Sequence, residues 1–357
     1  MSGVNVLSLF DGMSCGRNSF ERADIAVENY YSSEIDKYAL SVAQNNYPDN
    51  ICLGDVLDWE SWDIDFSQID YLIAGFPCQA WSVAGNSKGV EDPRGALAVT
   101  LSDIFKRVKK ENPALKFLFE NVRMKKEHLG FIDDLFGVSH TKINSAKVSA
   151  QNRVRCYWTN LGDTVSQPQD LGLLLQDVVE WGLVDRDKSY CLAASYFRGG
   201  SLKDYLEKYR RQLVFNYSSS GRGGGVVEDR TTEALKAGTL TATGYTNRSF
   251  TGVIQINPDK SAGGKQPHMQ HRVYSGEGKS PALTASFSSR TNICMEDLEI
   301  RKLTPLECER LQTLPEGYTK GVSNTQRYKM IGNGWTVEVI AHILRELEVL
   351  DTHEMLL

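Results

Sequence analysis

The sequence lacks a long hydrophobic run, a basic leader and a strong excess of charge of one sign. No apolar run among its 357 residues approaches the roughly 20 that a membrane-spanning helix needs. Residues 1–5 carry no basic side chain and lead straight into an apolar segment, so no signal peptide is indicated. These absences argue against a membrane protein and favour a cytoplasmic location.

The cysteines are scattered, odd in number and never paired as Cys-x-x-Cys. All seven stand alone, at positions 15, 52, 78, 156, 191, 294 and 308. This usage argues against a disulfide framework and structural zinc, and it suits a reducing cytoplasm. His268 and His271 lie in a glycine-rich stretch more typical of a surface loop than of a metal site. We therefore expect no bound metal.

The formal net charge of −5 hides an uneven distribution. Residues 1–160 carry 17 Lys and Arg against 21 Asp and Glu, whereas residues 191–300 carry 14 against 10. The basic excess in the middle of the chain lies where a polyanion would be held. A solvated loop region with a few extra charges explains the same numbers, so charge alone does not decide.

Strand-like and helix-like stretches alternate over the first 160 residues. The runs expected to form strands are residues 4–10, 29–33, 70–74, 117–119 and 154–158. The stretches expected to form helices are residues 14–22, 37–46 and 96–111. This alternation predicts an α/β fold with a doubly wound, mostly parallel sheet.

The character of the chain changes after residue 165, where glycine, serine and threonine become dense. A short motif of small, β-favouring residues occurs three times, at 192–198, 240–243 and 283–286. Arg198 ends the first copy, and Arg248 and Arg290 follow the second and third copies. Short strands and loops that present Arg, Ser and Thr suit phosphate contacts. A plain β-hairpin repeat is the alternative.

The end of the chain returns to a helical pattern. Pro305 is suited to the first position of a helix that continues from 306 to 312. Residues 332–334 read as a turn, and the apolar spacing over 336–348 predicts a helix with one buried face.

Cys78 follows the apolar run 71–75 and a proline. At the carboxyl end of a buried parallel strand, its thiol would lie where open α/β sheets bind their ligands. Glu120 directly follows the expected strand 117–119, so both side chains can face one crevice, and a thiol with a carboxyl group suggests nucleophilic attack assisted by an acid. No histidine neighbours Cys78, so a thiol-protease dyad has no support. A lone cysteine that is only a small buried hydrophobe is the alternative.

Three further strand ends indicate a nucleotide-like cofactor. The glycine-bearing turn at 10–16 follows the first strand, Glu34 ends the second, where ribose hydroxyls are bound in such folds, and Asp55 ends the next. The turn lacks the spacing of a phosphate-binding loop. An adenosine cofactor without a pyrophosphate fits better, although Gly12 and Glu34 could also be ordinary turn residues.

Nearly the whole chain resembles the C5-cytosine DNA methyltransferases. The matching segments occur in the family's order: residues 10–16, Glu34, Asp55, 75–79, 92–97, 120–122, 151–155, 301–312 and 332–333. The Pro-Cys, Glu-Asn-Val and Gln-x-Arg-x-Arg motifs together are highly specific. The motifs are similar to those of bacterial and phage enzymes, whereas Asp11 and Trp335 look like the branch that contains the animal de novo enzymes. The [DNS]PP[YFW] tetrapeptide of amino-methylating enzymes is absent.

The resemblance implies a role for each matching residue. Cys78 would attack C6 of a flipped-out cytosine, and Glu120 would hold or protonate N3. Arg155 would bind O2, with Arg153 supporting the site. The residues implied to bind S-adenosylmethionine, released as S-adenosylhomocysteine, are Phe10, Asp11, Gly12, Met13, Gly16, Glu34, Ile35, Asp55, Val56, Pro77, Leu97, Asn333 and Trp335. The DNA contacts that we expect are Gln79, Ser82, Arg94, Arg198, Arg248 and Arg290.

The resemblance also implies how the chain is divided. We expect a catalytic, cofactor-binding domain over residues 1–163 and a smaller, β-rich and loop-rich target-recognition domain over 164–324. Residues 325–357 would form a C-terminal helix that returns to the catalytic domain. The residues from 79 to 95 look like the family's mobile loop, which closes over the flipped base.

The expected partner is double-stranded DNA, and we expect a monomeric enzyme. It would be encoded by a bacterium or a phage and act in the cytoplasm, with a cognate restriction nuclease as a further partner. Two other functions stay open. A related branch methylates tRNA, although the 145 residues between the Gln-x-Arg-x-Arg motif and Arg301 favour a sequence-reading DNA enzyme. A catalytically silent DNA-binding or scaffold protein is the second, and the intact Cys78, Glu120 and Arg155 argue against it.

Overall fold

The computed structural model describes residues 3–77, 95–199, 205, 208, 210–217, 254–255, 273–275, 293–294 and 298–354. The chain divides into two compact units. Unit 1 consists of Met1–Leu174, Tyr190–Gly199 and Thr304–Leu357, and unit 2 consists of Leu175–Ser189 and Gly200–Leu303. The functional boundaries expected after residues 163 and 324 stay predictions.

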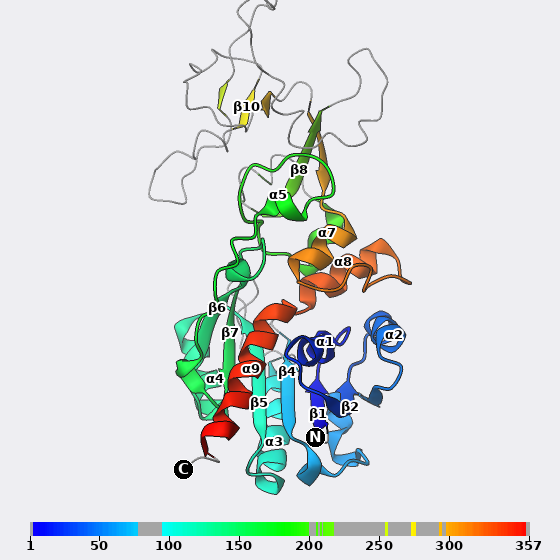
Figure 1. The fold of residues 1–357 in the computed structure, drawn as a ribbon. Helices are drawn as coiled ribbons and strands as arrows, with labels where there is room; N and C mark the ends of the chain where they lie inside the picture. Colours follow the sequence, from blue (N-terminus) through cyan, green and yellow to red (C-terminus); the bar gives the residue numbers. More distant parts are fainter. Residues whose placement is uncertain are drawn as a thin grey trace, which may run out of the picture. The chain divides into compact units, whose positions relative to one another are not determined.

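The centre of unit 1 is a sheet of seven strands in the order β3-β2-β1-β4-β5-β7-β6 (Figure 1). The strands are β1 (Val4–Leu9), β2 (Val27–Ser33), β3 (Ile51–Gly54), β4 (Tyr71–Gly75), β5 (Lys116–Val122), β6 (Thr141–Asn144) and β7 (Val154–Thr159). Strands β1 to β5 pair in parallel, and β7 is antiparallel to both β5 and β6. The expected doubly wound, mostly parallel sheet is confirmed. Its strand order reverses between β1 and β4, which is where such sheets bind ligands.

The helices described in unit 1 are α1 (Cys15–Arg22), α2 (Lys37–Asn46), α3 (Ala96–Glu111), α4 (Lys126–Phe136), α7 (Pro305–Leu311), α8 (Asn324–Asn333) and α9 (Val337–Glu354). Its 3-10 turns are η1 (Val56–Ser61), η2 (Phe66–Gln68), η4 (Ser145–Lys147), η5 (Gly162–Thr164) and η6 (Ala194–Arg198). Helix α1 packs against α9, and α3 packs against α4. None of the helices that the structure describes is both long and apolar enough to cross a membrane.

The two helix pairs cover opposite faces of the sheet. On β4, the ring of Tyr71 packs against Phe20 of α1, whereas the next residue, Leu72, belongs to the cluster that packs on α3. Successive side chains of a strand point to opposite faces, so α1 and α9 lie on one side and α3 and α4 on the other. Both faces of β4 and β5 are therefore covered, which explains their continuous apolar runs.

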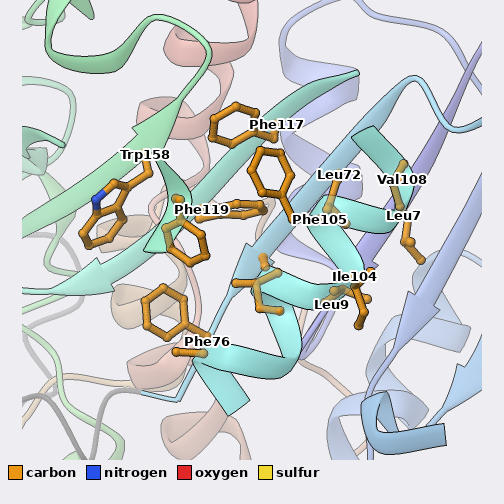
Figure 2. Close-up of a cluster of buried hydrophobic side chains, with 14 of the residues drawn as sticks. Leu7, Leu9, Leu72, Phe76, Ile104, Phe105, Val108, Phe117, Phe119 and Trp158 are labelled. Carbon is orange, nitrogen blue, oxygen red and sulfur yellow. The ribbon is translucent and has the colours of Figure 1, made fainter. Parts of the chain in front are cut away.

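A cluster of buried aromatic and aliphatic side chains joins the sheet to α3 (Figure 2). The strands and the β4 end contribute Leu7, Leu9, Leu72, Phe76, Phe117, Phe119 and Trp158, and α3 contributes Ile104, Phe105 and Val108. Phe119 is fully buried, with its ring centroid 4.7 Å from that of Phe136 and 5.4 Å from that of Phe105. Aromatic packing of this kind fixes α3 and α4 against the middle of the sheet.

The helix expected at Pro305 begins as predicted. Thr304 Oγ1 accepts the Glu307 N–H at 3.1 Å, and Glu307 Oε2 accepts the Thr304 N–H at 2.7 Å. This reciprocal pair is a capping box, with Pro305 at the first helical position. The ranges expected for α2 and α3 also match the observed helices.

Two local expectations are wrong. The strand expected at 117–119 runs from Lys116 to Val122, so Glu120 lies inside β5 instead of after it. Residues 332 and 333 end helix α8 and are not a turn, since α8 is stabilised by packing against η6.

Unit 2 is described only in part, and its described elements are mostly strands. They are α5 (Leu175–Val178), β8 (Leu213–Tyr217), β9 (Ile254–Gln255), β10 (Val273–Ser275), β11 (Ile293–Cys294) and β12 (Leu298–Lys302). Strands β8 and β12 form an antiparallel pair, and β9 to β11 form a three-stranded sheet. The guanidinium of Arg301 lies 4.1 Å from the ring centroid of Trp181, a cation–π contact within this unit.

Phe119→Ala should lower the free energy of unfolding by about 3–5 kcal/mol, because it removes buried apolar surface and leaves a cavity between β5 and α3. Urea denaturation followed by circular dichroism measures the loss. Val99→Ala is the control: Val99 is 38% exposed on α3, and its loss should stay within about 0.5 kcal/mol. A loss of under about 1 kcal/mol for Phe119→Ala would contradict a central role of this cluster.

Candidate active site

A cavity of about 490 Å³ opens in unit 1 at the carboxyl edge of the parallel strands. Its walls come from the residues that follow β1, β2, β3 and β4, from the end of β5, from the start of the antiparallel β7 and from α8. This is the edge at which the strand order reverses between β1 and β4. The volume is within the range of small-molecule sites.

Most of the residues expected to bind the cofactor or to act in catalysis line this one cavity. They are Phe10, Asp11, Gly12, Met13, Glu34, Ile35, Asp55, Val56, Pro77, Leu97, Glu120, Arg153, Arg155, Asn333 and Trp335. Gly16 does not line it. A Cβ at Gly16 would lie 2.4 Å from Ile73 Cδ1, so this glycine permits the close approach of α1 to β4.

The turn between β1 and α1 has an uncommon backbone conformation. Phe10 and Ser14 both have positive φ, at 55° and 61°, a region that residues other than glycine rarely adopt. The Asp11 carboxylate stabilises the turn by accepting hydrogen bonds from Ser8 Oγ and Ser14 Oγ at 2.5 Å and from Tyr30 Oη at 2.7 Å. Desolvation raises the pKa of Asp11, against the effect of these donors. The strained turn forms one wall of the cavity.

Glu34 and Asp55 both have acceptor capacity left. Glu34 Oε2 accepts the Gly12 N–H at 2.8 Å, and Oε1 accepts the next two backbone N–H groups at 2.7 Å. A carboxylate has about four acceptor positions, so one stays open. Asp55 Oδ1 accepts the Leu57 N–H at 3.0 Å and caps η1, while Oδ2 has no partner among the described residues. Each side chain can therefore accept a further hydrogen bond inside the cavity.

Glu120 is held between Arg155 and Trp335. Its Oε1 lies 2.9 Å from Arg155 Nε, and its Oε2 accepts the Trp335 Nε1–H at 3.1 Å. Glu120 and Arg155 are diagonal neighbours on β5 and β7, since Glu120 pairs with Tyr157 and Arg155 with Val122. Their side chains are only 10% and 13% exposed. The geometry gives a carboxylate and a guanidinium with fixed orientations on one wall of the cavity.

A glycine makes room for Trp335. A Cβ at Gly75, the last residue of β4, would lie 2.8 Å from Trp335 Nε1 and 3.2 Å from its Cε2. Any side chain at this position would displace the indole that donates to Glu120. Gly75 therefore ends strand β4 and also leaves the space that the Trp335 indole occupies.

Arg153 lies behind this pair, 4% exposed. Its guanidinium donates to three backbone carbonyls, those of Leu192 at 3.0 Å, Gly332 at 3.3 Å and Gly334 at 2.8 Å. Burial and the neighbouring Arg155 lower the pKa of Arg153. Arg153 thus connects β7 to two stretches of chain that are distant in sequence.

The sequence analysis missed several lining residues. They are Cys15, Ser33, Asp36, Ala39, Leu57, Gly75, Phe76, Asn121, Val122, Gln326, Lys329, Met330, Gly332 and Gly334. Most are chain neighbours of predicted residues, but Gln326, Lys329 and Met330 come from α8, which was not predicted. Their spacing of three and four residues, continued by Asn333, marks one face of a helix and could have indicated them.

Lys329 forms an ion pair with Asp36, and both residues line the cavity. Its Nζ lies 2.6 Å from Asp36 Oδ2, which joins α8 to the start of α2. Partial burial raises the pKa of Asp36, but the bonds from Lys329 and from backbone N–H groups outweigh burial, so the pKa lies below its usual value. The pair is about half exposed and contributes little to stability by itself.

Other predicted contacts lie elsewhere. Arg198 is exposed on η6, stacked 5.5 Å from the ring centroid of Phe197. The predicted residues outside the described part of the chain are Cys78, Gln79, Ser82, Arg94, Arg248 and Arg290. No group of three or more His, Cys, Asp or Glu within the described ranges could hold a metal ion.

The family model of C-5 cytosine-specific DNA methylases matches residues 4–349 of the chain. The chain belongs to this family. It is a DNA cytosine methyltransferase, and the match spans both units. The recognition made from the motifs of the sequence is thereby confirmed.

Relatives of this methyltransferase occur in bacteria and phage. The orphan methyltransferase M.SPRI of Bacillus phage SPR is 26% identical over 97% of this chain and 98% of its own length. The type II methyltransferase M.NlaX of Neisseria lactamica is 28% identical over 96% of both chains.

Solved structures share the fold at low identity. The Entamoeba histolytica methyltransferase EhMeth superposes with a TM-score of 0.58 at 14% identity, covering 97% of this chain and 98% of that one. A Spodoptera frugiperda DNMT2 mutant superposes with a TM-score of 0.55 at 16% identity, covering 97% and 99%. At such identities the likeness concerns the fold alone.

Gly332→Ala should destabilise this methyltransferase by about 1–3 kcal/mol. The new Cβ would lie 2.4 Å from the carbonyl carbon of Ala193, and a backbone contact cannot yield as a flexible side chain can. Urea denaturation measures the change. Gly130→Ala on α4 is the matched control, because a Cβ there meets nothing within 4 Å; it should be neutral or stabilise by up to about 1 kcal/mol. Equal stability of both variants would contradict the close approach.

Proposed function

We propose that this methyltransferase transfers the methyl group of S-adenosylmethionine to C5 of a flipped-out cytosine in a specific duplex DNA sequence, through a covalent bond between Cys78 and C6. The observation that carries the proposal is the buried Glu120–Arg155 pair, which shares a cavity with the acceptors Glu34 and Asp55. Pro77 lines the same cavity, and Cys78 is the next residue of the chain.

The residues of the cavity suit S-adenosylmethionine. The open acceptor position of Glu34 fits a ribose hydroxyl, and Asp55 Oδ2 fits the adenine amino group. The apolar side chains of Phe10, Ile35 and Leu97 suit the adenine faces. The product S-adenosylhomocysteine would occupy the same contacts.

The charges of the cavity also favour a cationic cofactor without phosphates. The acidic lining residues Asp11, Glu34, Asp36, Asp55 and Glu120 outnumber the basic ones, Arg153, Arg155 and Lys329. Near the turn after β1 and at the ends of β2 and β3 the lining charges are acidic, which favours a sulfonium centre and disfavours a pyrophosphate. We propose that Asn333 and Trp335 lie beside the amino-acid end of the bound cofactor.

Cytosine C5 is a poor nucleophile, and the proposed residues make it more reactive toward an electrophilic methyl group. The Cys78 thiolate adds to C6, which gives C5 the character of an enamine. When bound, S-adenosylmethionine supplies the electrophilic methyl group that C5 attacks. A base then removes the C5 proton, and Cys78 is eliminated. Cys15, a thiol that lines the cavity, is a poor candidate for this role, because burial raises its pKa to about 12.

Glu120 and Arg155 would stabilise the charge that develops on the ring. Glu120 would bind or protonate N3 as the thiolate adds. Arg155 uses three donor positions, toward Glu120 Oε1, Val154 O and Cys191 Sγ. A guanidinium has five N–H donors, so two are left for the cytosine O2.

A cytosine inside a duplex must leave the base stack to reach such a cavity, so base flipping belongs to the proposal. We assign DNA gripping and sequence choice to the region 164–324, with Arg198, Arg248 and Arg290 as phosphate contacts. Gln79, Ser82 and Arg94 would contact the strand around the flipped base.

The setting of the enzyme is proposed from its relatives. Similarity to the type II methyltransferase M.NlaX of Neisseria lactamica supports a cognate restriction nuclease as a partner. Similarity to a phage enzyme supports a bacterial or phage origin and action in the cytoplasm. We propose a monomer as the active form, without a metal ion.

The wild-type protein should form a covalent adduct with duplex DNA that carries 5-fluorocytosine in its recognition sequence, because fluorine at C5 prevents elimination of Cys78. Denaturing electrophoresis detects the adduct. Cys78→Ala should form none, and Cys52→Ala, which removes an exposed cysteine of β3, should trap as the wild type does. Absence of a wild-type adduct would overturn the thiol mechanism, and an adduct with 5-fluorocytosine tRNA but not with DNA would favour an RNA enzyme.

Glu120→Gln should raise the barrier to methyl transfer by about 3 kcal/mol, as expected for the loss of one electrostatic stabiliser. Single-turnover transfer of a labelled methyl group measures the rate. Glu127→Gln is the control, because Glu127 is exposed on α4. A Glu120→Gln rate within about threefold of wild type would count against the proposed role.

A further inference from the structure

Cys191 contacts both arginines of the site from outside the cavity. Its sulfur lies 3.6 Å from Arg153 Nη1 and 3.8 Å from Arg155 Nη2, as a hydrogen-bond acceptor of each. Arg153 and Arg155 line the cavity, whereas Cys191 is not among the lining residues. The sulfur therefore supports the guanidinium groups from behind and has no contact with a ligand in the cavity.

The chain holds this sulfur in place through the next residue. The Leu192 N–H donates to Gln151 Oε1 at 2.7 Å, and the Leu192 carbonyl accepts Arg153 Nη1–H at 3.0 Å. Gln151 is itself fully buried and donates to Leu311 O at 3.1 Å. Cys191 thus precedes a residue whose N–H and C=O are both fixed by hydrogen bonds. These bonds fix the backbone next to Cys191 and so help to position its sulfur against the arginines.

Two arginine side chains share one carboxylate at this point of the site. Arg153 and Arg155 are both buried, and the one carboxylate in contact with either of them in the described part of the chain is Glu120. Arg153 otherwise binds neutral carbonyls. Burial raises the pKa of Cys191, but the two guanidinium groups outweigh it, so the pKa lies below the usual thiol value. The Cys191 sulfur is thus a favourable hydrogen-bond acceptor for both guanidinium groups.

We propose that Cys191 is a positioning residue for methyl transfer: its sulfur fixes the Arg155 guanidinium in the orientation that binds Glu120 and presents its remaining donors to the substrate base. The inference rests on the proposed function, in which Arg155 binds the cytosine O2. Arg155 Nε is bound to Glu120 and Nη2 to Cys191, so the two contacts hold the planar group at both ends. Without the sulfur, Nε keeps Glu120 and Nη1 keeps the Val154 carbonyl at 3.0 Å, but Nη2 loses its contact and the guanidinium is held less tightly.

Two substitutions separate the acceptor from the volume it fills. Cys191→Val fills the space without an acceptor, so kcat should fall about tenfold while the KM for S-adenosylmethionine stays within about twofold of wild type. Cys191→Ser keeps an acceptor, although a smaller one with a shorter reach, so its kcat should fall only about threefold. Methyl transfer to duplex DNA at saturating and limiting cofactor gives both constants. Melting temperatures establish that the variants are folded.

Cys308→Val is the matched control. Cys308 is a buried cysteine of α7 in the same unit, and it is not among the residues that line the cavity. Its kcat should stay within about twofold of wild type.

A valine or serine variant that turns over as fast as wild type would overturn the proposal, and the serine result decides if valine prevents folding. A raised KM for S-adenosylmethionine with unchanged kcat would also overturn it, since Cys191 would then act on cofactor binding. Failure of the proposed function looks different. In that case the wild-type protein forms no adduct with 5-fluorocytosine DNA and no methylated DNA, whatever residue stands at 191.

Discussion

The hydrogen bonds of one buried guanidinium, that of Arg153, are the constraint on which the site depends. They join β7 to the carbonyl of residue 192 and to the backbone that follows α8. Gln151 binds the first of these stretches through the Leu192 N–H and a further one, the end of α7, through the Leu311 carbonyl. A buried charge left without these partners would be costly, so the hydrogen bonds of Arg153 hold these stretches of chain together. Only then does Trp335 reach Glu120.

The cavity carries two different electrostatic environments on one sheet edge. Near β1, β2 and β3 the lining charges are carboxylates, whose oxygens are largely engaged by local N–H and O–H donors. Near β5 and β7 a carboxylate and two guanidiniums face each other at close range. Parallel strands bring the acidic residues together because their carboxyl ends meet at one edge, and the antiparallel β7 adds the two arginines at the same edge from its amino end.

Local sequence patterns were sufficient for much of this architecture. The apolar run of β4 and the amphipathic spacing of α3 predicted the sheet, and the acidic residues after β2 and β3 indicated Glu34 and Asp55, because these signals depend on near neighbours. Most of the other lining residues were implied by the family resemblance. They were insufficient for α8 and for its Lys329, whose partner Asp36 lies 293 positions away. The sequence could not predict the contact of Cys191 with Arg153 either, because that contact depends on the hydrogen bond between Gln151 and the backbone of Leu192.

The contact between Glu120 and Trp335 spans 215 positions. During synthesis the strands of the sheet leave the ribosome long before the residues of α8 and α9, and chain order therefore sets the order in which the site is completed. A nascent chain can build its sheet and its aromatic core while Glu120 still lacks the indole donor. The active site is therefore complete only after the residues that follow α8 have been synthesised.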